Sequence, residues 1–195
     1  MGGSLRVSSS DWFGLHMLTP VCTEFSKMHP GVVIELLTDA RLFNLARREA
    51  DLVFRIQPFD QPDILQRKLM HIEYGLYGSE DYGDVKAGGG KGCPLITLDT
   101  AFDDFPDVQW LRRVLPDAPV IFRSNSRDVQ AMMCARGAGL AVLPRPLGDM
   151  IPGVRHINLG VSPPGRDIWL GYHRDLRGMR RLRTFLDMVL ARYGA

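Results

Sequence analysis

The 195-residue chain lacks long apolar runs and has few cysteines and little net charge, and each shortage excludes a class of protein. No apolar stretch approaches the roughly 20 residues that a membrane-spanning helix needs, so we expect no membrane association. The three cysteines are odd in number and lack CxxC spacing, so we expect reduced thiols in a cytoplasmic protein rather than a disulfide framework. A net charge of +2 gives this segment no reason to bind nucleic acid strongly.

Motifs that would support catalysis or cofactor binding are also missing. The five histidines show no metal-ligand spacing, so no metal site is expected. Glycine-rich residues 83–94 lack the Lys-Ser/Thr ending of a phosphate-binding loop and are interpreted as a surface loop, so no nucleotide cofactor is expected. Ser9, Asp11 and His16 leave nucleophilic catalysis as an alternative, but the G-x-S-x-G elbow is absent and we predict that the chain is not an enzyme.

The cysteines differ in their expected surroundings. Cys22 and Cys134 lie within apolar helical patterns and are expected to be small core residues. Cys93 lies beside glycines in the loop and is expected to be exposed. A redox role for Cys93 is a minor alternative, because no charged neighbour in the sequence activates its thiol.

The first 56 residues alternate strand and helix, which is typical of a parallel sheet covered by helices. The pattern predicts strands at Leu5–Val7, Val32–Leu37 and Ala50–Ile56. It predicts helices from after Trp12 to about Met28 and at Leu42–Arg48. One helix face is expected to carry Leu18, Val21, Cys22, Phe25 and Met28. Pro20 either kinks that helix or begins a later segment with Thr19 as its cap. Polar loops at the carboxyl ends of the strands, 8–12, 38–41 and 55–60, should form the ligand crevice.

A second α/β unit follows in the middle of the chain. An extended segment at Ile64–Ile72 leads to a new start at Tyr74–Tyr77, and strands and helices then alternate over Pro94–Leu98, Val108–Leu115, Pro119–Phe122, Ser126–Arg136 and Leu140–Leu143. The chain returns as a strand over Asp167–Tyr172. It closes with a helix over Leu176–Tyr193, whose expected buried face carries Leu176, Met179, Leu182, Leu186, Val189 and Tyr193.

Residues 123–146 carry the most specific local pattern, a polar helix start followed by a glycine stop and a buried strand. Asn125 or Ser126 can cap the helix, Asp128 suits the positive end of its dipole, and Gly137 can end it. Such a start is either an anion or polar-ligand site or an ordinary cap, and capping alone is the simpler interpretation.

Five arginines crowd the first half of the last helix, at positions 174, 177, 180, 181 and 183. DNA contact is one interpretation of this cluster. A solvated face is the favoured one, because the cluster is short and has no aromatic or groove-reading partner.

Together, several of these segments resemble the effector-binding domain of LysR-type transcriptional regulators. The resemblance is carried in order by Phe25 with 29–36, by 50–56, by 124–126 with 137–144, and by 168–177. It implies an α/β fold like that of type 2 periplasmic binding proteins, with two Rossmann-like lobes joined by two crossover strands. Lobe I would be 5–74 plus 173–195 and lobe II 75–172, with 1–4 a cloning remnant. Family members carry an amino-terminal winged helix-turn-helix that binds DNA, which this chain does not contain.

The resemblance also implies a ligand cleft between the lobes that holds a small-molecule effector, with a carboxylate as one candidate class. The candidate ligand-binding residues are Ser9, Ser10, Asp11, Trp12, Thr38, Arg55, Gln57, Thr100, Asn125 and Ser126. Arg55 would add a charge-assisted bond, and Trp12 would stack on a flat part of the ligand. Each has a structural alternative: Ser10 and Ser126 as caps, Arg55 paired with a surface acid, and Trp12 in the core.

Effector binding would favour one arrangement of the lobes and so change how paired subunits hold their DNA-binding domains. The resemblance implies a homodimer or tetramer in which the helix around Leu18–Met28 of one copy packs against the Ser126–Arg136 helix of another. A free-standing periplasmic-type solute-binding protein is the alternative function.

Overall fold

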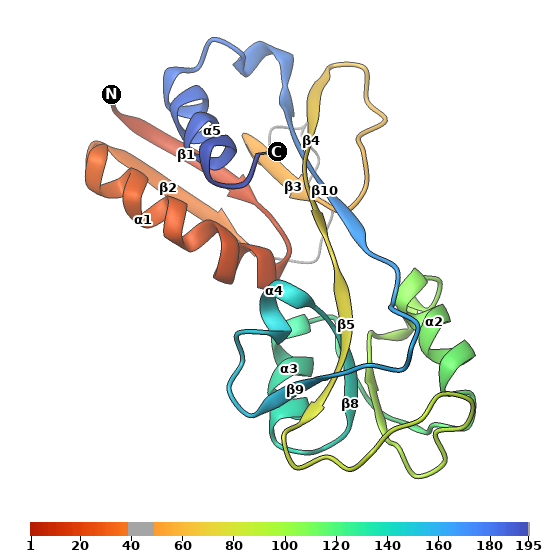
Figure 1. The fold of residues 1–195 in the computed structure, drawn as a ribbon. Coiled ribbons are helices and arrows are strands. Elements are labelled where there is room, and N and C mark those ends of the chain that lie inside the picture. Colours follow the sequence, from red (N-terminus) through yellow and green to blue (C-terminus); the bar gives the residue numbers. More distant parts are fainter. Residues whose placement is uncertain (39–48, 195) are drawn as a thin grey trace. The chain divides into compact units, whose positions relative to one another are not determined.

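The computed structural model describes residues 1–38 and 49–194 (Figure 1). The chain divides into two compact units, unit 1 (1–71 with 167–195) and unit 2 (72–166). The predicted boundaries, 74/75 and 172/173, fall a few residues later on both connecting segments. The predicted helix Leu42–Arg48 and the end of the predicted loop 38–41 lie outside the described residues.

Unit 1 is built on a five-stranded sheet, sheet A, in the order β2-β1-β3-β10-β4. Its strands are β1 (Gly3–Ser8), β2 (Val32–Leu37), β3 (Leu52–Arg55), β4 (Ile64–Ile72) and β10 (Arg166–His173). β1 pairs in parallel with both β2 and β3, and β10 runs antiparallel to β3. The predicted strands and the parallel pairing are therefore confirmed. The carboxyl ends of β1, β2 and β3 share one edge of the sheet.

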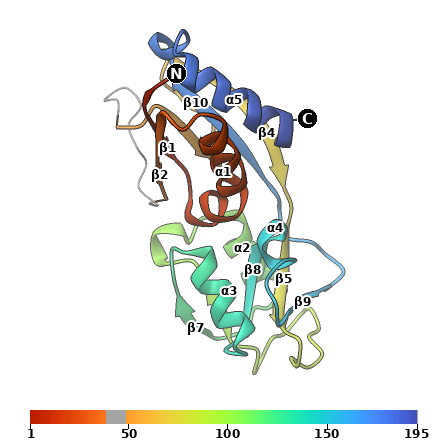
Figure 2. The ribbon, with the colours of Figure 1, turned by 90° about the vertical axis from the view of Figure 1, so that its left-hand side faces the viewer.

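Two long helices cover sheet A, α1 (Thr19–Met28) and α5 (Arg180–Tyr193). They lie side by side in both views (Figures 1 and 2), and Phe25 and Phe185 meet edge to face at 5.4 Å. The π-helical turn η1 (Phe13–Leu18) precedes α1, whose first turn contains Pro20. The helical run is continuous over 11–28, and Leu18 and Thr19 both have right-handed helical dihedrals. Pro20 therefore does not begin a separate segment, and Thr19 is not a cap.

Two details of the predicted helix faces are wrong. Met28 is 60% exposed and Cys22 is half-buried, because both lie at the open side of α1 rather than under it. The last helix begins at Arg180, after the short turn η4 (Arg174–Leu176), so Leu176 and Met179 precede it and are only half-buried. Leu182, Leu186 and Val189 are buried as predicted. Tyr193 is only half-buried, and its hydroxyl donates to the Met17 carbonyl at 2.7 Å.

Where β4 and β10 leave unit 1, an ion pair joins them. Asp167 contacts His71 Nδ1 at 2.7 Å and Lys68 Nζ at 3.1 Å. The bonds from His71 and Lys68 hold the pKa of Asp167 below its ordinary value.

Unit 2 contains a second five-stranded sheet, sheet B, in the order β7-β6-β8-β5-β9. Its strands are β5 (Tyr74–Ser79), β6 (Leu95–Thr97), β7 (Val120–Arg123), β8 (Leu140–Pro144) and β9 (Val154–Ile157). β6 is parallel to β7 and β8, whereas β5 is antiparallel to β8 and β9. The sequence analysis missed β9, which pairs with β5 over only four residues.

The helices of unit 2 are η3 (Thr100–Phe102), α2 (Pro106–Val114), α3 (Arg127–Ala135) and α4 (Arg145–Gly148). α3 ends where Gly137 adopts φ +79°, as its sequence indicates, and β8 is buried along its whole length. A buried ion pair ties α3 to α2: Arg127 Nη2 lies 2.9 Å from Asp107 Oδ2. The same guanidinium donates to the Val142 carbonyl of β8.

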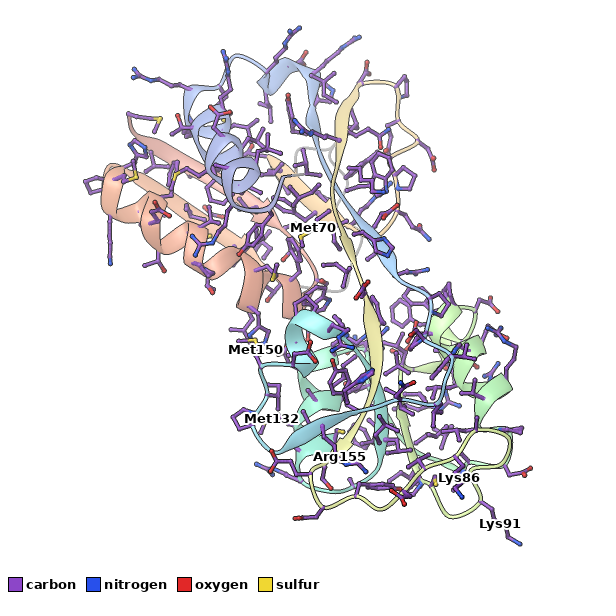
Figure 3. The ribbon with its side chains drawn as sticks, in the orientation of Figure 1. Met70, Lys86, Lys91, Met132, Met150 and Arg155 are labelled. Atoms are coloured by element: carbon purple, nitrogen blue, oxygen red, sulfur yellow. The ribbon has the colours of Figure 1, made fainter. Side chains whose placement is uncertain are left out.

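The glycine-rich segment 83–94 is irregular, as predicted, and three of its glycines have positive φ. Arg155, labelled with Lys86 and Lys91 in Figure 3, donates hydrogen bonds to the carbonyls of Tyr82 and Gly83. This arginine therefore anchors the start of the segment to β9. Within 1–38 and 49–194, no helix has both the length and the apolar character needed to cross a membrane.

Candidate functional site at the carboxyl edges of the two sheets

In unit 1 the loop that follows β1 is in contact with the end of β2. Because the two strands are parallel neighbours, Ser9 and Thr38 follow them at the same edge of sheet A. The Ser9 N–H donates to the Leu37 carbonyl at 3.0 Å, which extends the strand pairing into the loops. Ser9 and Thr38, two of the predicted site residues, are thereby brought together.

Gly14 allows this contact, and the sequence analysis did not single it out. A Cβ at Gly14 would lie 2.5 Å from Thr38 Cγ2 and 2.7 Å from Ser9 Oγ, closer than real contacts permit. The Gly14 N–H also donates to the Ser10 carbonyl at 3.0 Å. The available signal was a glycine in the first turn of a predicted helix, which often marks a close approach of neighbouring chain.

The four predicted residues after β1 differ in accessibility. Ser9 is 3% exposed, and its hydroxyl donates to the Ser10 carbonyl, so it shapes the loop. Ser10 and Asp11 are half-buried. Trp12 is only 3% exposed and packs edge to face on Phe13 at 5.5 Å. Its structural alternative, a core residue, therefore describes it better than a stacking surface.

Arg55 and Gln57 follow β3 at the same edge. The Arg55 guanidinium donates to the carbonyls of Gln57 and Pro58 and lies 3.9 Å from the centre of the Phe59 ring. Partial burial lowers its pKa, and the charge of Asp60 opposes that shift. Arg55 thus braces its own loop, while the Gln57 side chain is exposed.

In unit 2 the predicted residues lie at the carboxyl ends of β6 and β7, which are also parallel neighbours. The Ser124 N–H donates to the Thr97 carbonyl at 3.0 Å, so the two loops are joined at their bases. Thr100, at the start of η3, and Asn125 are exposed. Ser126 is the cap of α3: its hydroxyl accepts the Val129 N–H at 3.2 Å.

Buried polar groups that the sequence analysis missed hold this second loop in place. Gln130 is completely buried, and its amide donates to the Ser124 carbonyl at 2.8 Å. Arg127 donates to the Gln130 oxygen at 3.4 Å and pairs with Asp107. The loop that carries Asn125 therefore depends on a network within unit 2, which includes the ion pair between Arg127 of α3 and Asp107 of α2.

The predicted residues thus form two groups, one at each carboxyl edge. Whether a single cleft joins the groups stays a prediction. A separate shallow groove of about 510 Å³ lies between α1 and β2, lined by Cys22, Thr23, Ser26, Lys27, Ile34 and Leu36. None of the predicted ligand-binding residues lines it. Among the described residues, no group of three or more His, Cys, Asp or Glu side chains is arranged to hold a metal ion.

The chain is similar in sequence and in fold to known transcriptional regulators. The chain is 24% identical to the HTH-type transcriptional regulator CrgA of Neisseria meningitidis, over 98% of this chain and 68% of that protein. The solved CrgA regulatory domain superposes with a TM-score of 0.85 at 21% identity, covering all of both chains. The Synechocystis CcmR regulatory domain, solved in complex with 2-PG, gives a TM-score of 0.77 at 17% identity and covers 98% and 97% of the two chains.

At identities of 17–21%, the structural likeness shows only that the fold is shared. Family membership is shown instead by a match of the sequence to a family profile. The sequence profile of the LysR substrate binding domain matches residues 1–194. Two five-stranded mixed sheets, each with polar loops at the carboxyl edge of its parallel strands, agree with that match. The chain therefore belongs to the LysR substrate binding domain family, the effector-binding domains of LysR-type transcriptional regulators.

Proposed function

We propose that the chain binds a small polar effector through the side chains at the carboxyl edges of sheets A and B. The observation that carries the proposal is the grouping of hydroxyl and amide side chains where adjacent parallel strands end. In open α/β sheets this edge is where ligands bind. The principal contacts would be Ser10, Asp11 and Thr38 in unit 1 and Thr100, Asn125 and Ser126 in unit 2.

The chemistry of these groups favours an effector with several oxygen atoms. Serine and threonine hydroxyls and the Asn125 amide donate to carboxylate, hydroxyl or phosphoryl oxygens. The amino end of α3 adds the positive end of the helix dipole. The CcmR domain solved with 2-PG supports this class of small molecule.

Most of the other predicted residues would support the site without contacting the effector. Ser9 and Arg55 are committed to hydrogen bonds within their own loops, so we propose that they shape the edge. Trp12, whose ring is buried against Phe13, would support the loop that follows β1. Gln57, which is exposed, would reach a larger effector.

A thermal-shift screen against a panel of carboxylate, sugar and phosphorylated metabolites tests the proposal. Ser10→Ala and Asn125→Ala should each weaken binding of a hit about 2- to 10-fold, because one hydrogen bond contributes ~0.5–1.5 kcal/mol. Ser162→Ala and Asn158→Ala, exposed residues away from both edges, serve as matched controls. Hits that respond to neither edge variant, or equally to the controls, would place the site elsewhere.

We also propose that two copies associate, with α1 and β2 of one copy against α3 and β7 of the other. β2 and β7 are edge strands of their sheets, and each exposes apolar side chains. Val33 is 64% and Ile121 52% exposed. The neighbouring helices present Met28 and Met132, 60% and 47% exposed. Apolar edges of this kind usually meet another protein surface.

The alternative of a free-standing solute-binding protein is not favoured, because the family consists of transcription regulators. We propose that this chain likewise senses and does not catalyse. Its recognition of a specific DNA sequence would depend on a part of the protein beyond this chain. Acting on DNA would place the protein in the cytoplasm.

A further inference from the structure

The arginines that precede and begin α5 form the most strongly charged stretch of the molecule. Residues 174–183, here called the basic segment, contain five arginines and one aspartate, a net charge of +4. The whole chain carries only +2, so the rest of it has a net charge of −2. Positive charge is thus concentrated at one place on unit 1. Figure 3 shows nitrogen-tipped side chains extending outward from this part of the ribbon.

Among the described residues, only one of these five arginines pairs with a carboxylate. Arg174 pairs with Asp63 at 3.1 Å, and Arg181 donates to the Ser4 carbonyl at 2.6 Å. Arg177, Arg180 and Arg183 are exposed, and no ion pair joins them to the part of the chain that the structure describes.

The helix that follows makes this arrangement unfavourable by itself. The first turn of α5 has no acidic residue, and its cap, Met179, offers no side-chain hydrogen bond. Cations there oppose the positive end of the helix dipole. A local conflict without compensation is typical of surfaces kept for binding. An external polyanion would relieve both the dipole and the mutual repulsion of the arginines.

We propose that the basic segment contacts the phosphate backbone of duplex DNA. The guanidinium group is suited to phosphate, since its planar fork donates paired hydrogen bonds. A row of separate arginines on an exposed surface matches a row of phosphates better than one small anion. The chain belongs to a family of transcription regulators, so DNA is the polyanion that the complete protein meets.

The position of the amino end agrees with this assignment. Ser4 binds Arg181, and a Cβ on Gly3 would lie 3.5 Å from the same guanidinium. Any segment joined ahead of residue 1 therefore enters unit 1 beside the basic segment. CrgA is longer than this chain, which spans 68% of it, and is an HTH-type regulator. The proposed DNA contact rests on family membership and not on the effector site, so each can fail without the other.

The test measures fluorescence anisotropy of a labelled duplex of scrambled sequence titrated with the 195-residue chain between about 50 and 200 mM salt. We expect weak binding at low salt, with a Kd of about 10⁻⁴–10⁻⁶ M. The triple variant Arg177→Gln, Arg180→Gln, Arg183→Gln should bind at least about tenfold more weakly. Its slope of log K against log salt should fall by roughly 1 to 3, because each phosphate that an arginine neutralises adds about 0.9 to the slope.

A matched variant removes the same charge elsewhere: Arg67→Gln, Arg113→Gln, Arg136→Gln, all exposed and outside the basic segment. It should retain most of the affinity, and circular dichroism should show both variants folded. The proposal is overturned by absence of duplex binding at low salt or by equal weakening in the matched variant. It is also overturned if polyglutamate or phosphatidylserine vesicles bind through the same arginines more tightly than DNA.

Discussion

At the scale of single residues, neighbours decide whether a polar or aromatic side chain is available to a ligand. Trp12 and Asn125 both belong to the predicted site, yet Trp12 is packed on Phe13 and Asn125 is exposed. Gly14 has no side chain to offer, but its lack of one lets Thr38 approach Ser9. Among the cysteines, Cys134 is buried, whereas Cys22 and Cys93 are both half-buried, although Cys93 was expected to be exposed.

Burial raises the pKa of the Cys22 thiol to about 11 and that of Cys134 to about 12. The thiolate is the reactive form, so both should react slowly with a thiol reagent such as DTNB near neutral pH. Cys134 is also completely buried, whereas Cys93 is partly exposed. We expect one fast thiol per chain in the native protein, and Cys93→Ser should remove it. Persistence of the fast phase in Cys93→Ser would contradict this, and Cys22→Ser, in which it should remain, is the control.

At the scale of elements, a few polar contacts set where helices begin and how they are held. Ser126 starts α3 through its bond to Val129, and Arg127 in the next position binds Asp107 of α2. Both partners of that pair are less than a tenth exposed. The pair therefore links two helices and supports the loop that carries Asn125.

Breaking this buried pair should destabilise the fold strongly. Asp107→Ala leaves the Arg127 charge buried without its partner, which costs about 3–5 kcal/mol. Replacing both, Asp107→Leu with Arg127→Met, should cost much less, because no unpaired charge remains. Urea unfolding measures both. Arg145→Ala breaks the exposed pair with Asp149 and should cost at most about 1 kcal/mol. A decrease in stability in Asp107→Ala no larger than in that control would refute the argument.

At the scale of the whole molecule, each sheet leaves one apolar edge uncovered. The α1–β2 groove lies at the edge of sheet A, and β7 with α3 forms the corresponding edge of sheet B. Association of two copies would cover both. Association would also let an effector act on a DNA-bound oligomer. An effector that binds one arrangement of the associated copies more tightly than another would favour that arrangement.

Met28→Glu should therefore turn a dimer into a monomer at micromolar concentration in native mass spectrometry. An unpaired charge at a covered interface costs about 3–5 kcal/mol, which weakens association more than about 100-fold. Adding Met132→Lys should restore part of the association if α1 meets α3 of the other copy. Val161→Asp, at a residue that is 61% exposed outside this face, should have no effect. A monomeric wild-type chain would end the proposal.

Much of the architecture follows from periodicity along the chain. Strands β1, β2 and β6 to β8, as well as helices α1, α3 and α5, are recognisable because apolar residues recur at strand or helix spacing between polar stops. Such patterns are local, so they also locate the polar loops that must follow the strands. The family was indicated by something else, the resemblance of particular residues in four of these segments to LysR-type effector-binding domains.

Contacts between distant segments are not encoded in local periodicity. The short strand β9 forms because β5 pairs with it, and Met28 stays exposed although it belongs to the apolar stripe of α1. Likewise, Arg55 donates its hydrogen bonds within its own loop, and the buried Gln130 side chain donates to the Ser124 carbonyl. In each case the fate of a side chain depends on which chain segment fills the space beside it, and folding alone brings that segment there.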